Sequence, residues 1–149
     1  GAEPPVAFQE ALKPEFKQYQ KNVVSNAKTL SDNLAKRGFN IVSGGTDNHL
    51  MLVDLTNLGV TGSEAETLLD KAGITVNKNA IPYDQKPPTI TSGIRLGTPS
   101  VTTRGFGTKE MEEISEMITD VIKNRTSEST LESIRARSKQ MCEKFPIYT

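Results

Sequence analysis

The apolar positions in the first part of the chain recur every three or four residues, the period of a helix that is buried along one face. This pattern extends over residues 16–34, and Gly38 favours a helix end soon after it. Pro14 suits a first helical turn, so a shorter helix predicted over residues 6–12 is separated from the long one. The apolar positions of the long helix are Phe16, Tyr19, Val23, Ala27, Leu30 and Leu34.

Short apolar runs replace the helical spacing in the middle of the chain. They predict strands, because they are too short for helices and are bounded by turn-forming residues. In the run 49–55 both alternating sets of positions are apolar, so we expect a strand that is buried on both faces. The predicted strands cover residues 41–42, 49–55, 74–76 and 93–96.

Further helices are predicted between and after the strands. The segment Thr61–Glu64 fits a capping box, which predicts a helix that runs to about Ala72 and stops at Gly73. Helical spacing returns from Thr108, and the last helix is expected to end at Pro146. The acidic positions of the helix that begins at Thr108 lie mostly off its apolar side, so we expect them to face solvent.

Two segments, 78–92 and 97–107, are rich in Pro and Gly and lack periodicity. Irregular stretches of this length are uncommon in compact domains and are often functional. Helices at both ends of the chain around short strands indicate the α+β class, with a small antiparallel or mixed sheet covered by helices. The 149 residues predict a single domain over 1–149, with residues 1–5 as a linker or as added sequence.

Composition narrows the classes of partner. Lysine plus arginine total 18, as do aspartate plus glutamate, so nothing drives the whole chain toward nucleic acid or an anionic membrane. The single cysteine and the single histidine, Cys142 and His49, exclude an internal disulfide and a metal site of several Cys or two His. No apolar run approaches the ~20 residues of a membrane span and no targeting segment opens the chain, so we expect a cytoplasmic protein.

Arg95 stands inside an apolar strand pattern. A charge there should be paired, because an unpaired buried charge is very costly. Two interpretations are open. The residue forms a salt bridge with Asp47, Asp54 or a partner chain, or its guanidinium binds a ligand carboxylate through two parallel hydrogen bonds. The pattern alone favours the salt bridge.

Other polar residues also allow two interpretations each. Asn77, Lys78 and Asn79 follow a predicted strand, where they form a polar turn or present polar groups to a heterocycle. His49 follows a Gly-rich loop, where it ties down that loop or serves as a general base, although no nucleophile motif accompanies it. The residues themselves therefore supply no complete catalytic set.

Several strings in this part of the chain resemble serine hydroxymethyltransferase. The similarity keeps order and spacing from about Phe8 to Thr149, and it covers only the smaller, C-terminal domain of that enzyme. The matching strings are 43–50 (SGGTDNHL), 52–55 (LVDL), 74–79 (ITVNKN), 92–99 (SGIRLGTP) and 102–105 (TTRG).

The resemblance implies a transferase of one-carbon metabolism with the fold of type I pyridoxal phosphate enzymes. That family moves the hydroxymethyl carbon of serine to tetrahydrofolate, giving glycine and 5,10-methylenetetrahydrofolate, and the full-length protein would be a homodimer or tetramer. The family's Thr-His-Lys motif, which carries the cofactor-binding lysine, is absent from this sequence. We therefore expect a fragment that is inactive without the large pyridoxal phosphate domain. The alternative is a non-catalytic binding or interaction module that retains the fold.

The resemblance also assigns roles to single residues. It places Arg95 on the carboxylate of serine or glycine. Asn79 would meet the folate ring, and Pro87, Pro88 and Thr89 would line the folate site. The residues that would support the arginine strand are Thr98, Arg104 and His49.

Overall fold

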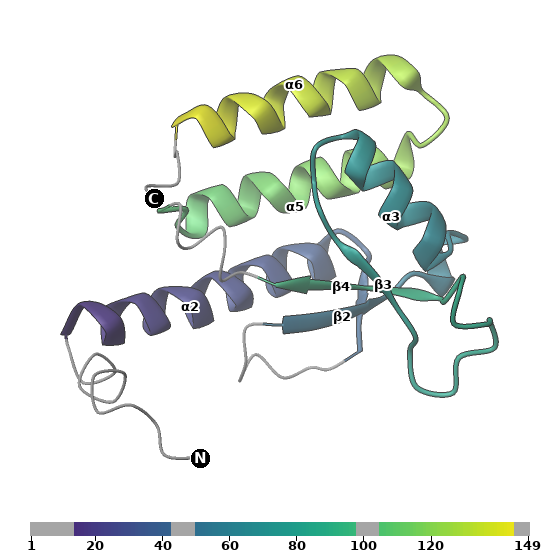
Figure 1. Ribbon diagram of the computed structural model, residues 1–149, viewed down its shortest axis with the longest axis horizontal. Helices are drawn as coiled ribbons and strands as arrows, with labels where there is room; N and C mark the ends of the chain where they lie inside the picture. Colours follow the sequence, from purple (N-terminus) through teal and green to yellow (C-terminus); the bar gives the residue numbers. More distant parts are fainter. Residues whose placement is uncertain (1–13, 43–49, 98–104, 145–149) are drawn as a thin grey trace.

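The computed structural model describes residues 14–42, 50–97 and 105–144. Within these ranges a four-stranded sheet packs against helices, which confirms the α+β prediction (Figure 1). The helices are α2 (Pro14–Lys36), α3 (Gly62–Lys71), α5 (Thr108–Lys123) and α6 (Glu128–Lys144), with a short 3-10 helix at Thr56–Leu58. The strands are β1 (Asn40–Ile41), β2 (Leu50–Asp54), β3 (Asn77–Asn79) and β4 (Gly93–Gly97).

The sheet is antiparallel throughout, with the strand order β1-β2-β4-β3. The central pair, β2 and β4, aligns Leu52 with Arg95 and Val53 with Ile94. The edge strand β3 adds Asn77 opposite Arg95 and Asn79 opposite Gly93. Since side chains alternate between the faces of a sheet, Arg95 lies on the face opposite to that of Val53 and Ile94.

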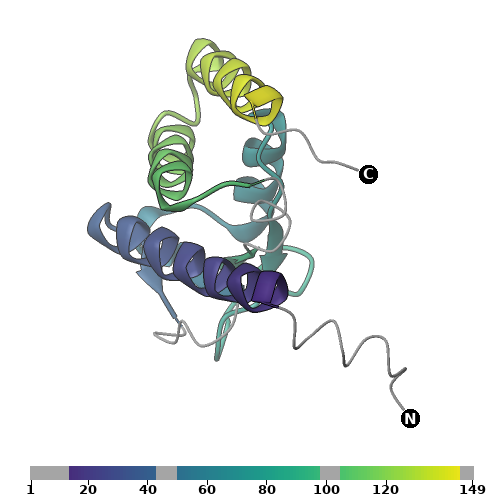
Figure 2. The same cartoon turned by 90° about the vertical axis from the view of Figure 1, so that its left-hand side faces the viewer.

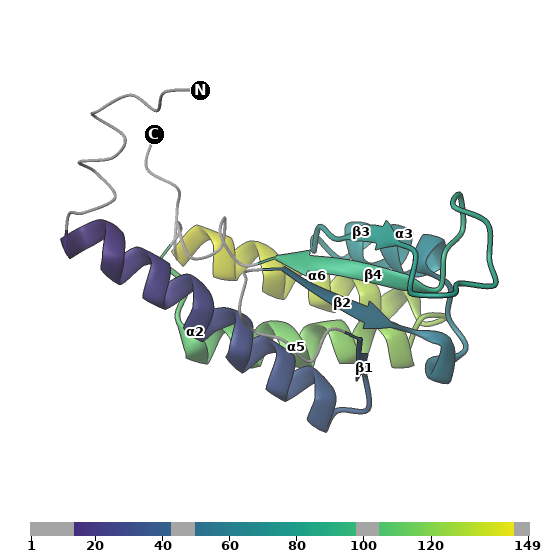
Figure 3. The ribbon, with the colours of Figure 1, turned by 90° about the horizontal axis from the view of Figure 1, so that it is seen from below.

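Helices cover the face that carries Val53 and Ile94. In Figure 1 the sheet lies below α5 and α3, and α6 lies above α5. Figure 2 shows α5 between α2 and α6, and α5 packs against both of these helices. Seen from below in Figure 3, β2 and β4 lie in front of α5 and α6, so the other face of the sheet is turned toward the viewer. The core between sheet and helices includes Met51, Val53, Ile94, Leu96, Leu34, Leu69, Met111 and Ile118.

The predicted burial of the second strand on both faces is wrong. Met51 and Val53 are 3% and 0% exposed, but Leu52 and Asp54 are only half-buried. The reason is that, among the described residues, helices cover one face of the sheet alone. The apolar side chain of Leu52 therefore remains partly exposed on the face that also carries Asp54 and Arg95.

The third predicted strand is displaced along the chain. The apolar run 74–76 predicted it, but β3 begins at Asn77. The Ile74 N–H donates to the Leu69 carbonyl at 2.7 Å, so Ile74 closes the end of α3 after Gly73, whose φ is +82°. Val76 is buried as a core residue. The apolar run thus serves the helix end and the core, and the polar residues after it pair with β4.

The predicted helices are confirmed where the structure describes them. α2 begins at Pro14, as a first-turn proline allows. The capping box of α3 is formed, because Thr61 Oγ1 accepts from the Glu64 N–H at 3.1 Å and Glu64 Oε1 accepts from the Thr61 N–H at 3.3 Å. The predicted helix over residues 6–12 and the end at residue 146 lie outside the described residues.

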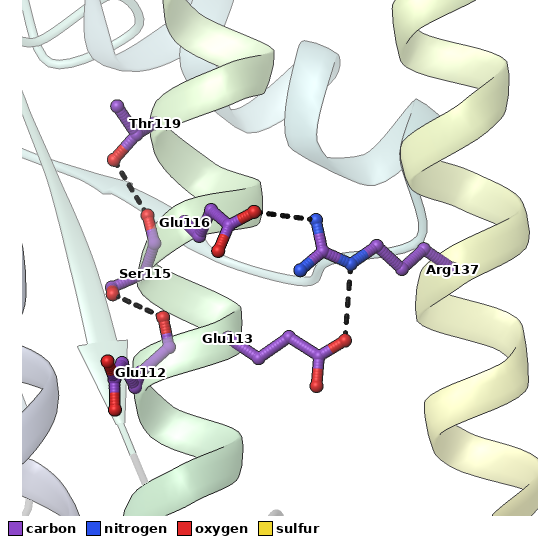
Figure 4. A network of polar contacts seen from close by, with 6 residues as sticks. All are labelled: Glu112, Glu113, Ser115, Glu116, Thr119 and Arg137. Carbon is purple, nitrogen blue, oxygen red and sulfur yellow. Dashed lines mark hydrogen bonds and ion pairs between the residues drawn. The ribbon is translucent and has the colours of Figure 1, made fainter.

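The acidic side chains Glu113 and Glu116 of α5 are partly exposed to solvent, as expected, but they also take part in a contact that the sequence did not show. Arg137 of α6 reaches across to α5, where its Nε donates to Glu113 Oε1 at 3.1 Å and its Nη1 to Glu116 Oε1 at 3.2 Å (Figure 4). Burial acts to lower the pKa of Arg137, but its hydrogen bonds to Glu116 and Glu113 outweigh this effect and raise that pKa. Spacing along one helix did not reveal this pairing, because the partner lies on another helix.

Candidate functional site

The face of the sheet that no described helix covers carries Arg95 and polar residues of the neighbouring strands. Arg95 lies in its middle row, between Leu52 on β2 and Asn77 on β3. The next row holds Asp54 on β2 and Asn79 on β3, with Gly93 between them. We refer to this set of residues as the Arg95 face. Among the described strands, Arg95 is the only cationic residue whose side chain lies on the side away from the helices.

Arg95 is exposed, and no acidic side chain of the described residues lies within 4.0 Å of its guanidinium. The salt bridge to Asp54 that the sequence left open is therefore not formed. Asp54 Oδ1 instead accepts from the Thr56 N–H at 2.9 Å and from its hydroxyl at 2.6 Å. Asp47, the other acid considered, lies outside the described residues. The planar guanidinium fork thus faces outward, in a position to bind a carboxylate in two parallel hydrogen bonds.

The edge strand beside Arg95 is held in place from the helix side. Lys78 points away from the Arg95 face toward α3, because it pairs with Ile94. Its N–H donates to Glu66 Oε2 at 2.9 Å and its Nζ lies 3.5 Å from Glu66 Oε1. The backbone hydrogen bond from Lys78 is the main reason that the pKa of Glu66 is lowered. Of the three polar residues singled out in the sequence, only Asn77 and Asn79 therefore belong to the Arg95 face.

Asn79 stands at the end of β3, half-buried, with its Nδ2 donating to the Ala80 carbonyl at 2.9 Å. The segment that follows, residues 80–92, connects β3 to β4, which form an antiparallel pair. In Figure 1 this connecting segment extends beyond the end of the sheet at the lower right. Pro87, Pro88 and Thr89 lie in it and are exposed. The structure thus joins these residues to the strands that carry Asn79 and Arg95.

Asp84 organises the connecting segment. Its Oδ2 accepts from the Ile81 N–H at 3.2 Å and from the Ser92 N–H at 2.8 Å. Its Oδ1 accepts from the Ser92 hydroxyl at 2.7 Å and from the Lys86 N–H at 2.9 Å. These bonds, first that of the Ser92 hydroxyl and then that of the Lys86 amide, lower the pKa of Asp84 to about 2. Sequence reasoning missed this residue, and its only local signal was an aspartate two residues before the amide it accepts.

Close backbone contacts fix the far end of the same segment against α3. The Gly62 N–H donates to the Thr91 carbonyl at 3.0 Å, and the Ser63 N–H donates to the Ile90 carbonyl at 2.9 Å. A Cβ on Gly62 would lie 2.0 Å from Thr91 Oγ1 and 2.3 Å from the Gly93 carbonyl oxygen. Only glycine fits this approach, so the start of α3 defines where β4 begins.

Three residues named from the resemblance, His49, Thr98 and Arg104, lie outside the described residues. Among the described ones, no group of three or more His, Cys, Asp or Glu side chains could hold a metal ion. A shallow hollow between α3 and the turn before α6 contains no residue of the Arg95 face. It is lined by Ser63, Glu64, Thr67, Leu68, Arg125 and Thr126.

Comparison with protein families gives one match that covers most of the chain. Residues 2–118 match the family model described as serine hydroxymethyltransferase. This range includes α2, the whole sheet and most of α5. No helix within the described residues is long and apolar enough to cross a membrane.

Proposed function

The chain belongs to the serine hydroxymethyltransferase family, and from that premise we propose that the Arg95 face is its contribution to the substrate site. In this proposal Arg95 binds the carboxylate of serine or glycine. The observation that carries it is the exposed guanidinium in the middle of a strand, with no acidic partner among the described residues. A cation held on a rigid strand, rather than on a loop, suits precise placement of a ligand.

Two parallel bonds from the guanidinium would fix the carboxylate in position and in angle. Each hydrogen bond to a charged group contributes roughly 1.5–3 kcal/mol. When the amino nitrogen is held by the reacting group, a carboxylate held at two points prevents rotation about the N–Cα bond, so the bonds at Cα keep one orientation. The same requirement selects α-amino acids over simple amines. Asn77 and Leu52 flank Arg95 in register and would limit the directions from which the carboxylate can approach.

Pyridoxal phosphate, when bound, supplies the electron sink for the reaction. The residues of the Arg95 face do not fit as its covalent holder, because none of them is a lysine. The one lysine on the strands, Lys78, points toward α3 and pairs with Glu66. The sequence also lacks a Thr-His-Lys motif. We therefore assign the cofactor to the large domain of the same protein and keep Arg95 as this chain's part of the amino-acid site.

The folate co-substrate would lie next to the amino acid, against the segment 80–92. Asn79 precedes this segment and offers an amide to a heterocycle. Pro87, Pro88 and Thr89 are exposed on the same connection and would contact the ligand largely through their backbone. The position of these residues supports the assignment, because the segment begins and ends on the two strands that carry Asn79 and Arg95.

The partners in this proposal are serine or glycine, tetrahydrofolate and the large domain, with further copies of the protein as a homodimer or tetramer. Leu52, an apolar side chain half-exposed on the same face as Arg95, suits a surface that a second domain covers. The proposal therefore includes that the 149-residue chain is inactive by itself and works in the cytoplasm as part of the longer enzyme.

The test replaces Arg95 in the complete enzyme by Ala and by Lys. Loss of two charge-assisted bonds should lower kcat/KM for serine by about 100-fold or more, and Lys should restore little because it lacks the fork. Arg135→Ala is the matched control, since Arg135 is an exposed arginine on α6, away from the sheet. Unchanged serine turnover and glycine affinity in Arg95→Ala would show that the assignment is wrong.

A second candidate, a non-catalytic binding module, is favoured by the missing Thr-His-Lys motif. Calorimetric titration of the 149-residue chain with tetrahydrofolate distinguishes the two. The enzyme proposal expects weak or no binding, because the site is completed by another domain. Strong folate binding by this chain alone would favour the module.

A further inference from the structure

The Asp84 carboxylate joins the two ends of the segment 80–92. A local turn would need only the bond from the Lys86 amide, two residues away. Two of its four donors, however, belong to Ser92, which is the last residue before β4. A third donor, the Ile81 amide, lies just after β3. Asp84 therefore closes the base of the segment 80–92 rather than shaping its tip.

Both points that Asp84 joins lead directly to the Arg95 face. Ile81 is two residues after Asn79, and Ser92 is three residues before Arg95. The two ends also touch, since a Cβ built on Gly93 would lie 2.8 Å from Ile81 Cγ2 and 3.0 Å from the Asn79 carbonyl oxygen. From these contacts we infer that Asp84 is a positioning residue, which fixes Asn79 and Arg95 relative to each other across the β3–β4 pair.

The backbone beside each joined point is strained. Tyr83, just before Asp84, has φ +58°, and Thr91, just before Ser92, has φ +60°. Such values are uncommon for residues other than glycine and are an outlier for a β-branched residue such as threonine. Strain of this kind persists only where the surroundings enforce it, and it is concentrated at functional sites. The enforcing contacts are the Asp84 bonds on one side and the buried Thr91 hydroxyl, which donates to the Gly93 carbonyl at 3.1 Å, on the other.

The inference deepens the proposed function and rests on it for its substrates. In this inference Asp84, which touches neither ligand, sets the distance between Asn79 on the folate side and Arg95 on the carboxylate side. Glu66 complements Asp84, because it holds the middle of β3 through Lys78 while Asp84 holds its exit. Strand pairing sets the register of Asn79 against Gly93, and the Asp84 carboxylate fixes the end of β3 that the pairing leaves free.

The first experiment uses Asp84→Asn, which keeps size and shape. In the carboxylate both oxygens accept hydrogen bonds. The asparagine amide keeps one acceptor oxygen and places an NH2 group opposite the donors of the other. Ser92→Ala removes the hydroxyl donor alone and serves as the milder variant. Asp84→Glu is the conservative variant, because it keeps both acceptor oxygens. The matched control is Asp70→Asn, on the exposed side of α3.

In the complete enzyme we expect Asp84→Asn to raise KM for both serine and tetrahydrofolate about tenfold, with kcat changed by less than about threefold. Ser92→Ala should shift both constants less in the same direction, and Asp84→Glu should restore part of the loss. A merely destabilised protein would lose active molecules, which lowers kcat and leaves both KM values unchanged. Unchanged KM values in Asp84→Asn would overturn the inference.

A second readout uses only the 149-residue chain and separates the two proposals. Residual dipolar couplings report the angle between the backbone N–H vectors of Asn79 and Arg95, which Asp84→Asn should change and Asp70→Asn should not. If Arg95→Lys leaves serine binding intact, the proposed function fails, and these couplings alone decide the positioning role. Couplings identical to the unsubstituted chain would refute that role.

Discussion

The contact between Gly62 and the end of the segment 80–92 gives a prediction in which two known effects oppose each other. Gly62 is the first residue of α3, and alanine there should favour the helix by up to ~1 kcal/mol. The structure argues for the opposite sign, because the new Cβ would lie 2.0 Å from Thr91 Oγ1 and 2.3 Å from the Gly93 carbonyl oxygen. The second of these atoms is backbone within β4 and cannot move aside without shifting the strand.

The magnitude follows from the balance. Extra methyl groups forced into packed regions cost about 1–3 kcal/mol, and a backbone neighbour puts this case at the upper end. Subtracting the gain in helix propensity leaves a net loss of about 2 kcal/mol in the free energy of unfolding for Gly62→Ala. With a urea m-value of ~2 kcal/mol/M, the midpoint should fall by about 1 M.

Urea unfolding followed by circular dichroism at 222 nm measures this difference. Ser63→Ala is the matched control, because Ser63 is the next residue of the same helical turn and the variant keeps the hydrogen bond from its backbone N–H to the Ile90 carbonyl. The control should unfold within about 0.5 kcal/mol of the unsubstituted chain. Gly62→Ala as stable as the control would refute the reasoning, since propensity would then outweigh the close contact.

Three further outcomes are expected. The pKa of Asp84 is lowered to about 2, so its contribution to the order of the segment 80–92 is complete above the unfolded value near 4 and is lost as pH falls through 2. The protection of that segment's amides against exchange, relative to the intrinsic rate at each pH, should fall in this window, and Asp84→Asn should abolish this pH dependence. Arg137→Met should lower stability by less than ~1 kcal/mol, because its bonds to Glu113 and Glu116 are partly exposed, and melting at low and at high salt should show the difference shrinking with salt. Arg95→Ala should change the free energy of unfolding by no more than ~0.5 kcal/mol, since the side chain is exposed, and a larger loss in a urea titration would reveal a structural partner.

Local rules predicted the parts of the fold that depend on neighbours in sequence. The period of α2, the capping box at Thr61 and the glycine at the end of α3 each involve residues within one or two turns, so the sequence shows them directly. The α+β class followed from the order of these elements. The position of β3 did not, because the apolar run 74–76 was needed by the end of α3 and by the core, and only pairing with β4 distinguishes these uses.

The sequence singled out Arg95, Asn77 and Asn79, which lie on one face of the sheet, but it did not reveal Asp84. Arg95 was conspicuous because it interrupts an apolar strand, but the pattern alone favoured a salt bridge that Asp54 does not form. The role of Asp84 depends on Ser92, eight residues further along an irregular segment, and no periodicity links the two. Contacts of this kind arise from the path of the backbone, which the order of apolar and polar residues does not encode.

Closing the segment 80–92 at its base has a consequence for how the protein can vary. Asp84 and Ser92 join the chain near the sheet, and the Pro87 carbonyl accepts from the Ile90 and Thr91 N–H groups, so the exposed side chains of this segment can change while the backbone bonds that lead to β4 are kept. Related chains can therefore alter what this segment recognises while the strand beneath it keeps its geometry.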